Sequence, residues 1–162
     1  MSKKRYIAFG LIMTLLLAGL AYAQGQHDHG GSGGSTHDMG SMPTQDVLVE
    51  GAVVGFAVMA NPEHLKMLRD MKMKEDIEPG TTHNITITLK DQQSGQPITG
   101  ATVSLRVVDP GGKDQIKTLK FEPSMNSYDA YFNMPDKGRY QILMLARYGE
   151  QKKTAGIYHE VH

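Results

Sequence analysis

The chain of 162 residues carries 17 Lys plus Arg and 17 Asp plus Glu, so its formal net charge at pH 7 is zero. A balanced charge without a basic patch argues against nucleic acid as a partner. The absence of cysteine excludes thiolate catalysis, Cys-ligated zinc and disulfides. Methionine, in contrast, occurs 11 times, which is more than usual for a chain of this length.

The first 23 residues have the three parts of a secretory signal peptide. Lys3, Lys4 and Arg5 are followed by an apolar stretch over residues 7–20, and small residues precede the expected cleavage site after Ala23. An uncleaved membrane anchor is the alternative, but the apolar stretch is short for a membrane span. The sequence therefore predicts an extracytoplasmic protein, periplasmic or secreted.

Residues 24–45 form a low-complexity tail rich in Gly, His and Met, which predicts a flexible segment. Imidazole and thioether groups together can bind copper in either oxidation state. The candidate ligands here are His27, His29 and His37. A solubilising spacer with incidental histidines is an equally acceptable interpretation of the tail.

A folded domain is expected over residues 46–162. Apolar residues over 47–59 predict one long strand, with Gly51 and Gly55 as bulges. Asn61, followed by a proline and a glutamate, predicts the capped start of a helix that runs from residue 62 to about residue 74.

From residue 81 onward, apolar and polar residues alternate with period two, which indicates half-buried strands separated by turns. About seven strands are expected, so the predicted fold is an all-β, antiparallel, immunoglobulin-like β-sandwich with one short helix inserted after the first strand. Beyond residue 102, strands are expected over 102–108, 115–121, 128–133, 139–148 and 154–161.

Several turn and strand motifs resemble the YtkA-like family of small exported β-sandwich domains over about residues 81–161. The matching segments are Gly95–Ile98 leading into Gly100–Val103, Val108–Gly112, Tyr128–Ala130 and Lys137–Tyr140. The resemblance implies an accessory domain outside the cytoplasm, since some members are associated with copper handling or oxidase assembly. It carries over no catalytic residue, and the segment from Met59 to Lys74 lies outside the family pattern.

The sequence contains no Gly-x-Ser-x-Gly, His-Glu-x-x-His or phosphate-binding glycine motif, so an enzyme is not expected. Acidic residues of the strand region, such as Asp129 and Asp136, are interpreted as turn and solvated-edge residues. The two histidines near the C-terminus, His159 and His162, are interpreted as surface residues, and Met125 as a packing residue.

The helix provides the second metal candidate. His64, Met67 and Met71 stand at i, i+3 and i+7, which places them on one face at 3.6 residues per turn. A plain buried face with methionine as a flexible filler is the alternative.

Two further residues extend this candidate site. Met59 ends the preceding strand. His83 is two residues before the first of the alternating apolar positions of the next strand, so its side chain is expected on the same inward face. With His64 and Met67 they are expected to form a site with two imidazole and two thioether ligands, which would favour Cu(I). A core histidine that is satisfied by hydrogen bonds is the alternative for His83.

These observations predict an exported copper-binding protein that acts as a metal carrier or buffer and passes the ion to a protein partner. The alternative is a non-catalytic accessory module that docks on a membrane enzyme or other partner through the methionine-rich helix face, because methionine adapts to varied surfaces.

Overall fold

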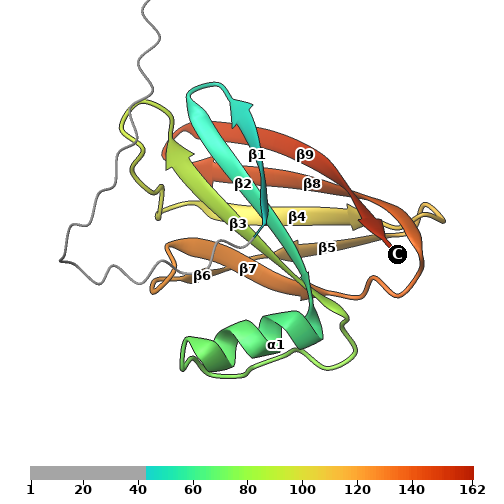
Figure 1. Cartoon of the computed structure of the whole chain (residues 1–162). Coiled ribbons are helices and arrows are strands. Elements are labelled where there is room, and N and C mark those ends of the chain that lie inside the picture. Colours follow the sequence, from blue (N-terminus) through green and yellow to red (C-terminus); the bar gives the residue numbers. More distant parts are fainter. Residues whose placement is uncertain (1–42) are drawn as a thin grey trace, which may run out of the picture. The chain divides into compact units, whose positions relative to one another are not determined.

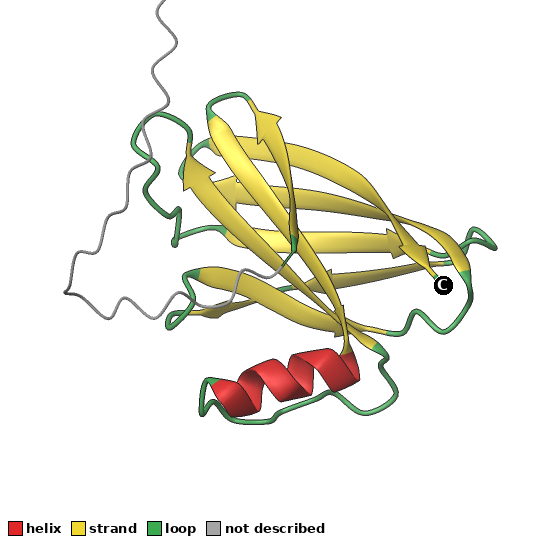
Figure 2. Cartoon of the chain, in the orientation of Figure 1, coloured by secondary structure: helices red, strands yellow, loops and turns green. Residues whose placement is uncertain are grey.

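The computed structural model describes residues 43–162, which form two antiparallel sheets that pack face to face (Figures 1 and 2). One sheet has the strand order β1-β2-β3-β7-β6 and the other β5-β4-β8-β9. This arrangement confirms the predicted antiparallel β-sandwich with one short helix. The strands are β1 (Thr44–Val49), β2 (Ala52–Ala60), β3 (His83–Asp91), β4 (Thr102–Val108), β5 (Asp114–Thr118), β6 (Lys120–Glu122), β7 (Ser127–Phe132), β8 (Gly138–Tyr148) and β9 (Gln151–Val161), and the helix is α1 (Asn61–Asp70).

The core lies between the sheets and is built from alternate residues of the strands, as the period-two pattern predicts. Burial of these apolar side chains away from water stabilises the sandwich. The fully buried residues include Phe56, Ile85, Ile87, Leu105, Tyr128, Phe132, Tyr140 and Ile142. In the part of the chain that is described, no helix is long and apolar enough to cross a membrane.

Two buried tyrosines fix connections at the edges of the core. The Tyr128 hydroxyl donates to the carbonyl oxygen of Ile98 at 2.9 Å and accepts the N–H of Ala101 at 3.0 Å. The Tyr140 hydroxyl, near the start of β8, accepts the N–H of Asp136 at 3.1 Å. This second bond has the form of the tyrosine corner of immunoglobulin-like sandwiches.

The first predicted strand is in fact a hairpin. Glu50 and Gly51 have φ angles of 35° and 82° and reverse the chain between β1 and β2. Positive φ at both central residues is typical of the two-residue turns that join antiparallel strands. Gly51 is therefore a turn residue and not a bulge. Gly55 is not a bulge either, since it pairs regularly with Asp46 and Thr88. The helix α1 follows the second strand and not the first.

The strand expected over 115–121 is also two strands, and they belong to different sheets. β5 pairs with β4, whereas β6 pairs with β7. Leu119 lies between them, is buried, and donates its N–H to the carbonyl oxygen of Val103 at 2.8 Å. The chain crosses from one sheet to the other at this residue, and alternation alone does not reveal such a crossing.

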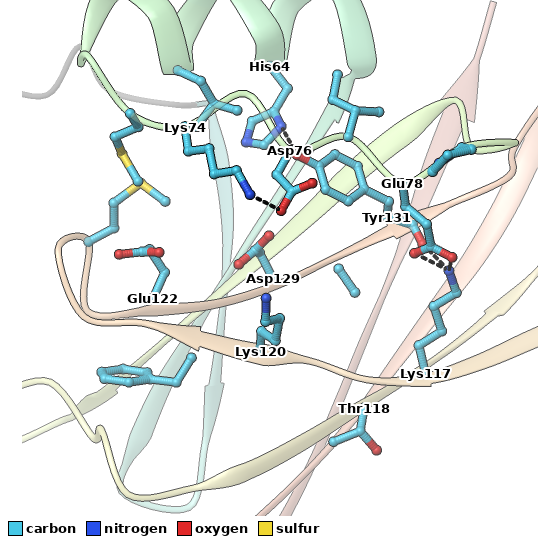
Figure 3. Close-up of a pocket in the computed structure, with 17 residues that line it drawn as sticks. His64, Lys74, Asp76, Glu78, Lys117, Thr118, Lys120, Glu122, Asp129 and Tyr131 are labelled. Atoms are coloured by element: carbon cyan, nitrogen blue, oxygen red, sulfur yellow. Dashed lines mark hydrogen bonds and ion pairs between the residues drawn. The ribbon is translucent and has the colours of Figure 1, made fainter.

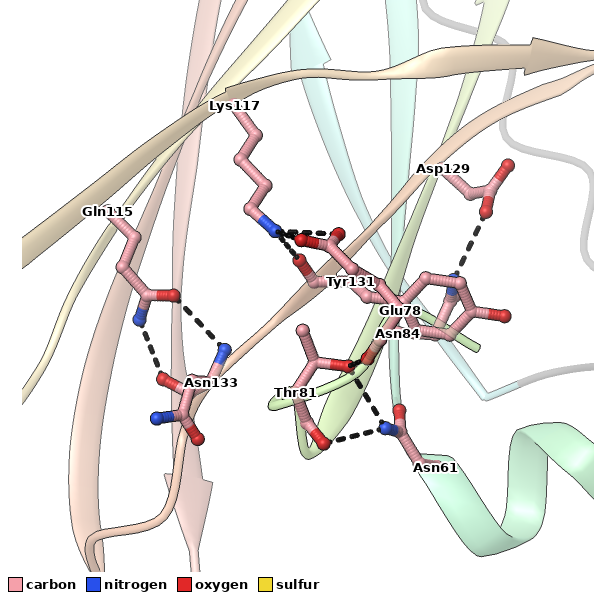
Figure 4. Close-up of polar contacts among 9 residues, drawn as sticks. All are labelled: Asn61, Glu78, Thr81, Asn84, Gln115, Lys117, Asp129, Tyr131 and Asn133. Carbon is pink, nitrogen blue, oxygen red and sulfur yellow. Dashed lines mark hydrogen bonds and ion pairs between the residues drawn. The ribbon is translucent and has the colours of Figure 1, made fainter. Parts of the chain in front are cut away.

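Helix α1 is shorter than predicted and is not capped by the Asn61 side chain. Instead, Asn61 Nδ2 donates to the carbonyl oxygen of Thr81 at 2.9 Å, which ties the start of the helix to the segment that enters β3 (Figure 4). The helix ends at Asp70, and Lys72 has a φ of 55°. A left-handed residue just beyond the last turn is a common way to end a helix.

Candidate metal site

A groove of about 840 Å³ lies between α1 with the segment that follows it and the outer face of strands β6 and β7 (Figure 3). Strand alternation explains why the groove is on the outer face: Phe132 points into the core, so the preceding Tyr131 points away from it. His64 and Leu68, one helical turn apart, line the groove from α1. Among the residues of the helix, these two are the buried ones.

His64 is the central group of this groove. It is only 3% exposed, and its Nδ1 lies 3.0 Å from the hydroxyl of Tyr131 (Figure 3). Burial lowers the pKa of His64, so the imidazole is uncharged at neutral pH. Burial also raises the pKa of Tyr131 to about 12, so its hydroxyl keeps its proton. An uncharged imidazole retains a nitrogen lone pair, which a metal ion requires.

Two methionines outside the predicted set of ligands line the same groove. Met73 follows α1, and Met125 lies in the turn between β6 and β7. The Met73 sulfur lies 3.9 Å from Oγ of Ser124, the residue next to Met125. The helical spacing rule could not find either of them, because both lie outside the helix and 52 positions separate them. Met125 was interpreted as a packing residue, whereas the structure places it on the groove wall.

Of the three candidate ligands predicted on one helix face, only His64 lines the groove. Met67 and Met71 are half-buried, but neither lines the groove. A second metal ligand on the same helix would have to lie one turn from His64 and face the groove. Leu68, at i+4, occupies that position. The buried face of the helix is therefore centred on His64 and Leu68.

The structure also separates His83 from His64. Met59 pairs with Asn84, which pairs with Tyr131, so Met59 lies on the outer face of the sheet, the face covered by α1. His83 pairs with Phe132 and lies on the core face. The expected site with two imidazoles and two thioethers is not assembled, because residues of opposite parity in a strand point to opposite faces.

Charged residues line part of the groove. Lys117 Nζ lies 2.8 Å from the Glu78 carboxylate and donates to the carbonyl oxygen of Tyr131 at 2.7 Å (Figure 4). Lys74 pairs with Asp76 at 3.1 Å. The Lys117 contacts hold the segment that follows the helix near the sheet, whereas the Lys74–Asp76 pair lies within that segment.

Also lining the groove, Asp129 accepts a hydrogen bond from Asn84 Nδ2 at 3.2 Å (Figure 4). Burial raises the pKa of Asp129, and the charge of Glu122 raises it further. Asp129 is thus a half-buried groove residue, which corrects its interpretation as a solvated edge residue.

Within residues 43–162, no group of three or more His, Asp or Glu side chains is placed to hold a metal ion. Thioether sulfur is the other soft donor among the described residues. The groove offers it, since one imidazole and two thioethers line one space. The tail candidates His27, His29 and His37 lie outside the described residues.

Fold and groove together define an immunoglobulin-like β-sandwich with a His- and Met-lined groove under its single described helix. Within this class, the model of the YtkA-like family matches residues 70–144, which confirms the resemblance predicted from the sequence. The match includes the end of α1 and runs into β8, so β9 and most of α1 lie outside it. A search among curated proteins finds no significant match.

Solved structures of the same fold come from two bacteria. A DUF4426 family protein from Pseudomonas aeruginosa has a TM-score of 0.53 at 15% identity, over 73% of this chain and 94% of its own. FetP from uropathogenic Escherichia coli, expressed in the periplasm, has a TM-score of 0.54 at 12% identity, over 72% and 92%. A copper-bound FetP variant has a TM-score of 0.53 at 12% identity, over 72% and 93%. At these levels of sequence identity, the similarity shows a shared fold and no more.

Proposed function

We propose that this protein binds copper outside the cytoplasm and acts as a non-enzymatic carrier or buffer of the metal. The observation that carries the proposal is the groove in which the uncharged imidazole of His64 faces the same space as the thioethers of Met73 and Met125. Nitrogen and thioether donors favour Cu(I) over hard cations such as Mg²⁺ and Ca²⁺. A copper-bound protein of the same fold supports the choice of metal.

Tyr131 has a positioning role in this proposal. If His64 carries its proton on Nδ1, it donates to the Tyr131 oxygen, and Nε2 remains free for the ion. Tyr131 is only 9% exposed, so its ring and hydroxyl are held by packing. The hydrogen bond thus fixes which imidazole nitrogen faces the groove.

The tail and the leader complete the proposal. The leader over residues 1–23 would export the chain, and the tail histidines His27, His29 and His37 would collect the ion before it reaches the groove. Release to a protein partner would occur by ligand exchange. A carrier needs such exchange, and the groove opens to solvent along polar residues such as Lys74 and Glu122.

The test is a Cu(I) titration against a chromophoric chelator under reducing conditions. Met73→Leu with Met125→Leu keeps nearly the same side-chain volume but removes both sulfurs. We expect Cu(I) affinity to fall at least about tenfold, a change of about 1.4 kcal/mol. The matched control is Met67→Leu with Met71→Leu, which removes two sulfurs from the same helix region but outside the groove.

Equal affinity in the groove variant and the wild type would refute the groove as the copper site. If only the helix pair lowered affinity, the ligands would be those predicted from helical spacing. If neither pair mattered, a docking role for the methionine-rich helix face would be the better account.

A further inference from the structure

A pair of imidazoles lies at one end of the sandwich, on the face of the β3 sheet opposite to the groove. His83 is the first residue of β3, and His159 lies close to the end of β9, in the other sheet. His83 pairs with the buried Phe132, and His159 pairs with the buried Tyr140. Because directly opposed residues share a face, both histidines point to the interior, where the apolar core ends. His159 is therefore half-buried, which corrects its interpretation as a surface residue.

The two rings are close enough to share one ion. Their centroids lie 6.4 Å apart, with 71° between the ring planes. An imidazole nitrogen bonds a metal at about 2.0–2.1 Å, which puts the ion about 3.2 Å from the ring centre. Two rings on one ion therefore have centres about 4.5 Å apart at a right angle and about 6.4 Å apart when linear. The observed separation is that of the linear arrangement, and a tetrahedral ion, for which the centres lie about 5.2 Å apart, would draw the two rings about 1 Å closer.

The surroundings of the pair suit metal binding. The Nδ1 of His83 lies 2.9 Å from Oγ1 of Thr82, and this hydroxyl also accepts the N–H of Met134 at 2.7 Å. A histidine ligand usually bonds a fixed oxygen through its second nitrogen, which orients the ring. Burial lowers the pKa of both histidines, and each ring is therefore uncharged at neutral pH.

We propose that His83 and His159 together bind one divalent transition-metal ion that prefers imidazole, such as Cu(II), Ni(II) or Zn(II), and so link the two sheets. Water fills the remaining positions, since residues 43–162 hold no third His, Asp or Glu placed to complete the site. This site is separate from the groove, because His83 and Tyr131 point to opposite faces of their sheet. It also differs in chemistry, since nitrogen ligands without sulfur do not select Cu(I).

The test is a Zn(II) titration of the chain from Gln24 onward, followed by NMR of the individual imidazole ring protons. We expect the ring signals of His83 and His159 to shift together along one saturation curve. In His83→Gln, where the glutamine amide can still bond Thr82, the response of His159 should be lost or weakened at least about tenfold. His162→Asn is the matched control, because it removes a nearby histidine outside the pair.

Independent curves for the two histidines, or an unchanged His159 response in His83→Gln, would overturn the shared site and leave a packing pair. The same holds if the control abolishes the response. Methyl-region spectra report whether each variant is folded. The outcome is separate from that of the groove, because Zn(II) binding here does not depend on Met73 or Met125.

Discussion

Single side chains in this protein take their roles from what packs over them. Asp129 lies in β7, a strand in which apolar and polar residues alternate. It is nevertheless half-buried, on the face of the sheet that α1 covers. It belongs to a hydrogen-bonded chain in which Thr86 donates to Asn84 Oδ1 at 2.8 Å and Asn84 donates to Asp129 at 3.2 Å. The charged form of its carboxyl is disfavoured by burial.

The pKa of Asp129 predicts a pH dependence of stability. Because the folded-state pKa is raised above the unfolded value, the folded state binds more protons, and stability falls as pH rises through the raised pKa. Asp129→Asn keeps an oxygen acceptor for Asn84 and cannot ionise. We expect the variant to gain stability relative to the wild type between pH 4 and pH 7, in urea unfolding at each pH. A constant difference across this range would contradict the prediction.

At the scale of elements, a glycine of β2 shows why a strand position can require the absence of a side chain. Gly55 was predicted to be a bulge, but it pairs regularly with Asp46 on one side and Thr88 on the other. A Cβ at this position would collide with Oγ1 of Thr88 and lie 3.0 Å from Oδ1 of Asp46. The glycine therefore makes room for the side chains of the neighbouring strands.

Gly55→Ala should destabilise the protein by about 1–3 kcal/mol, measured as the free energy of unfolding in urea, because an overpacked site forces its neighbours to move. Gly100→Ala is the matched control, since a Cβ there meets no atom within 4 Å. Adding Thr88→Ala to Gly55→Ala should recover part of the loss. Equal effects at positions 55 and 100 would show that the collision is not the cause.

At the scale of the whole molecule, a lysine joins the two sheets. Lys153 of β9 is 11% exposed at its side chain, and its Nζ donates to the carbonyl oxygen of Glu50 at 2.9 Å. Glu50 lies in the turn between β1 and β2, and its carboxylate is 3.4 Å from the same nitrogen. The stem of Lys153 packs between the sheets, while its charged end bonds the turn.

Lys153→Met should lower the free energy of unfolding by about 1–2 kcal/mol, because methionine fills the space of the stem but cannot donate a hydrogen bond. Lys152→Met removes the neighbouring exposed lysine and should change stability by less than about 0.5 kcal/mol. Thermal unfolding of both variants, each compared with the wild type, measures the difference. A loss as small for Lys153 as for Lys152 would mean that the turn does not depend on this bond.

The candidate metal site could be predicted only in part from the sequence. Helical spacing identified His64 correctly as a residue of the buried helix face. The same spacing selected Met67 and Met71 as its partners, whereas Met73 and Met125 share its groove. The helix ends at Asp70, and the chain then turns back along the sheet, so the residues near His64 come from outside the helix.

The sequence by itself determined the antiparallel sandwich, the one helix of the folded domain over residues 43–162, most strand positions and the abundance of soft metal donors, because these depend on composition and on spacing between near neighbours. The tertiary structure decided which donors meet. That depends on strand register, on the hairpin at Glu50 and Gly51, and on the sheet face that the helix covers. A shift of one residue moves a side chain to the other face, so contacts between distant segments follow only once all strands are paired.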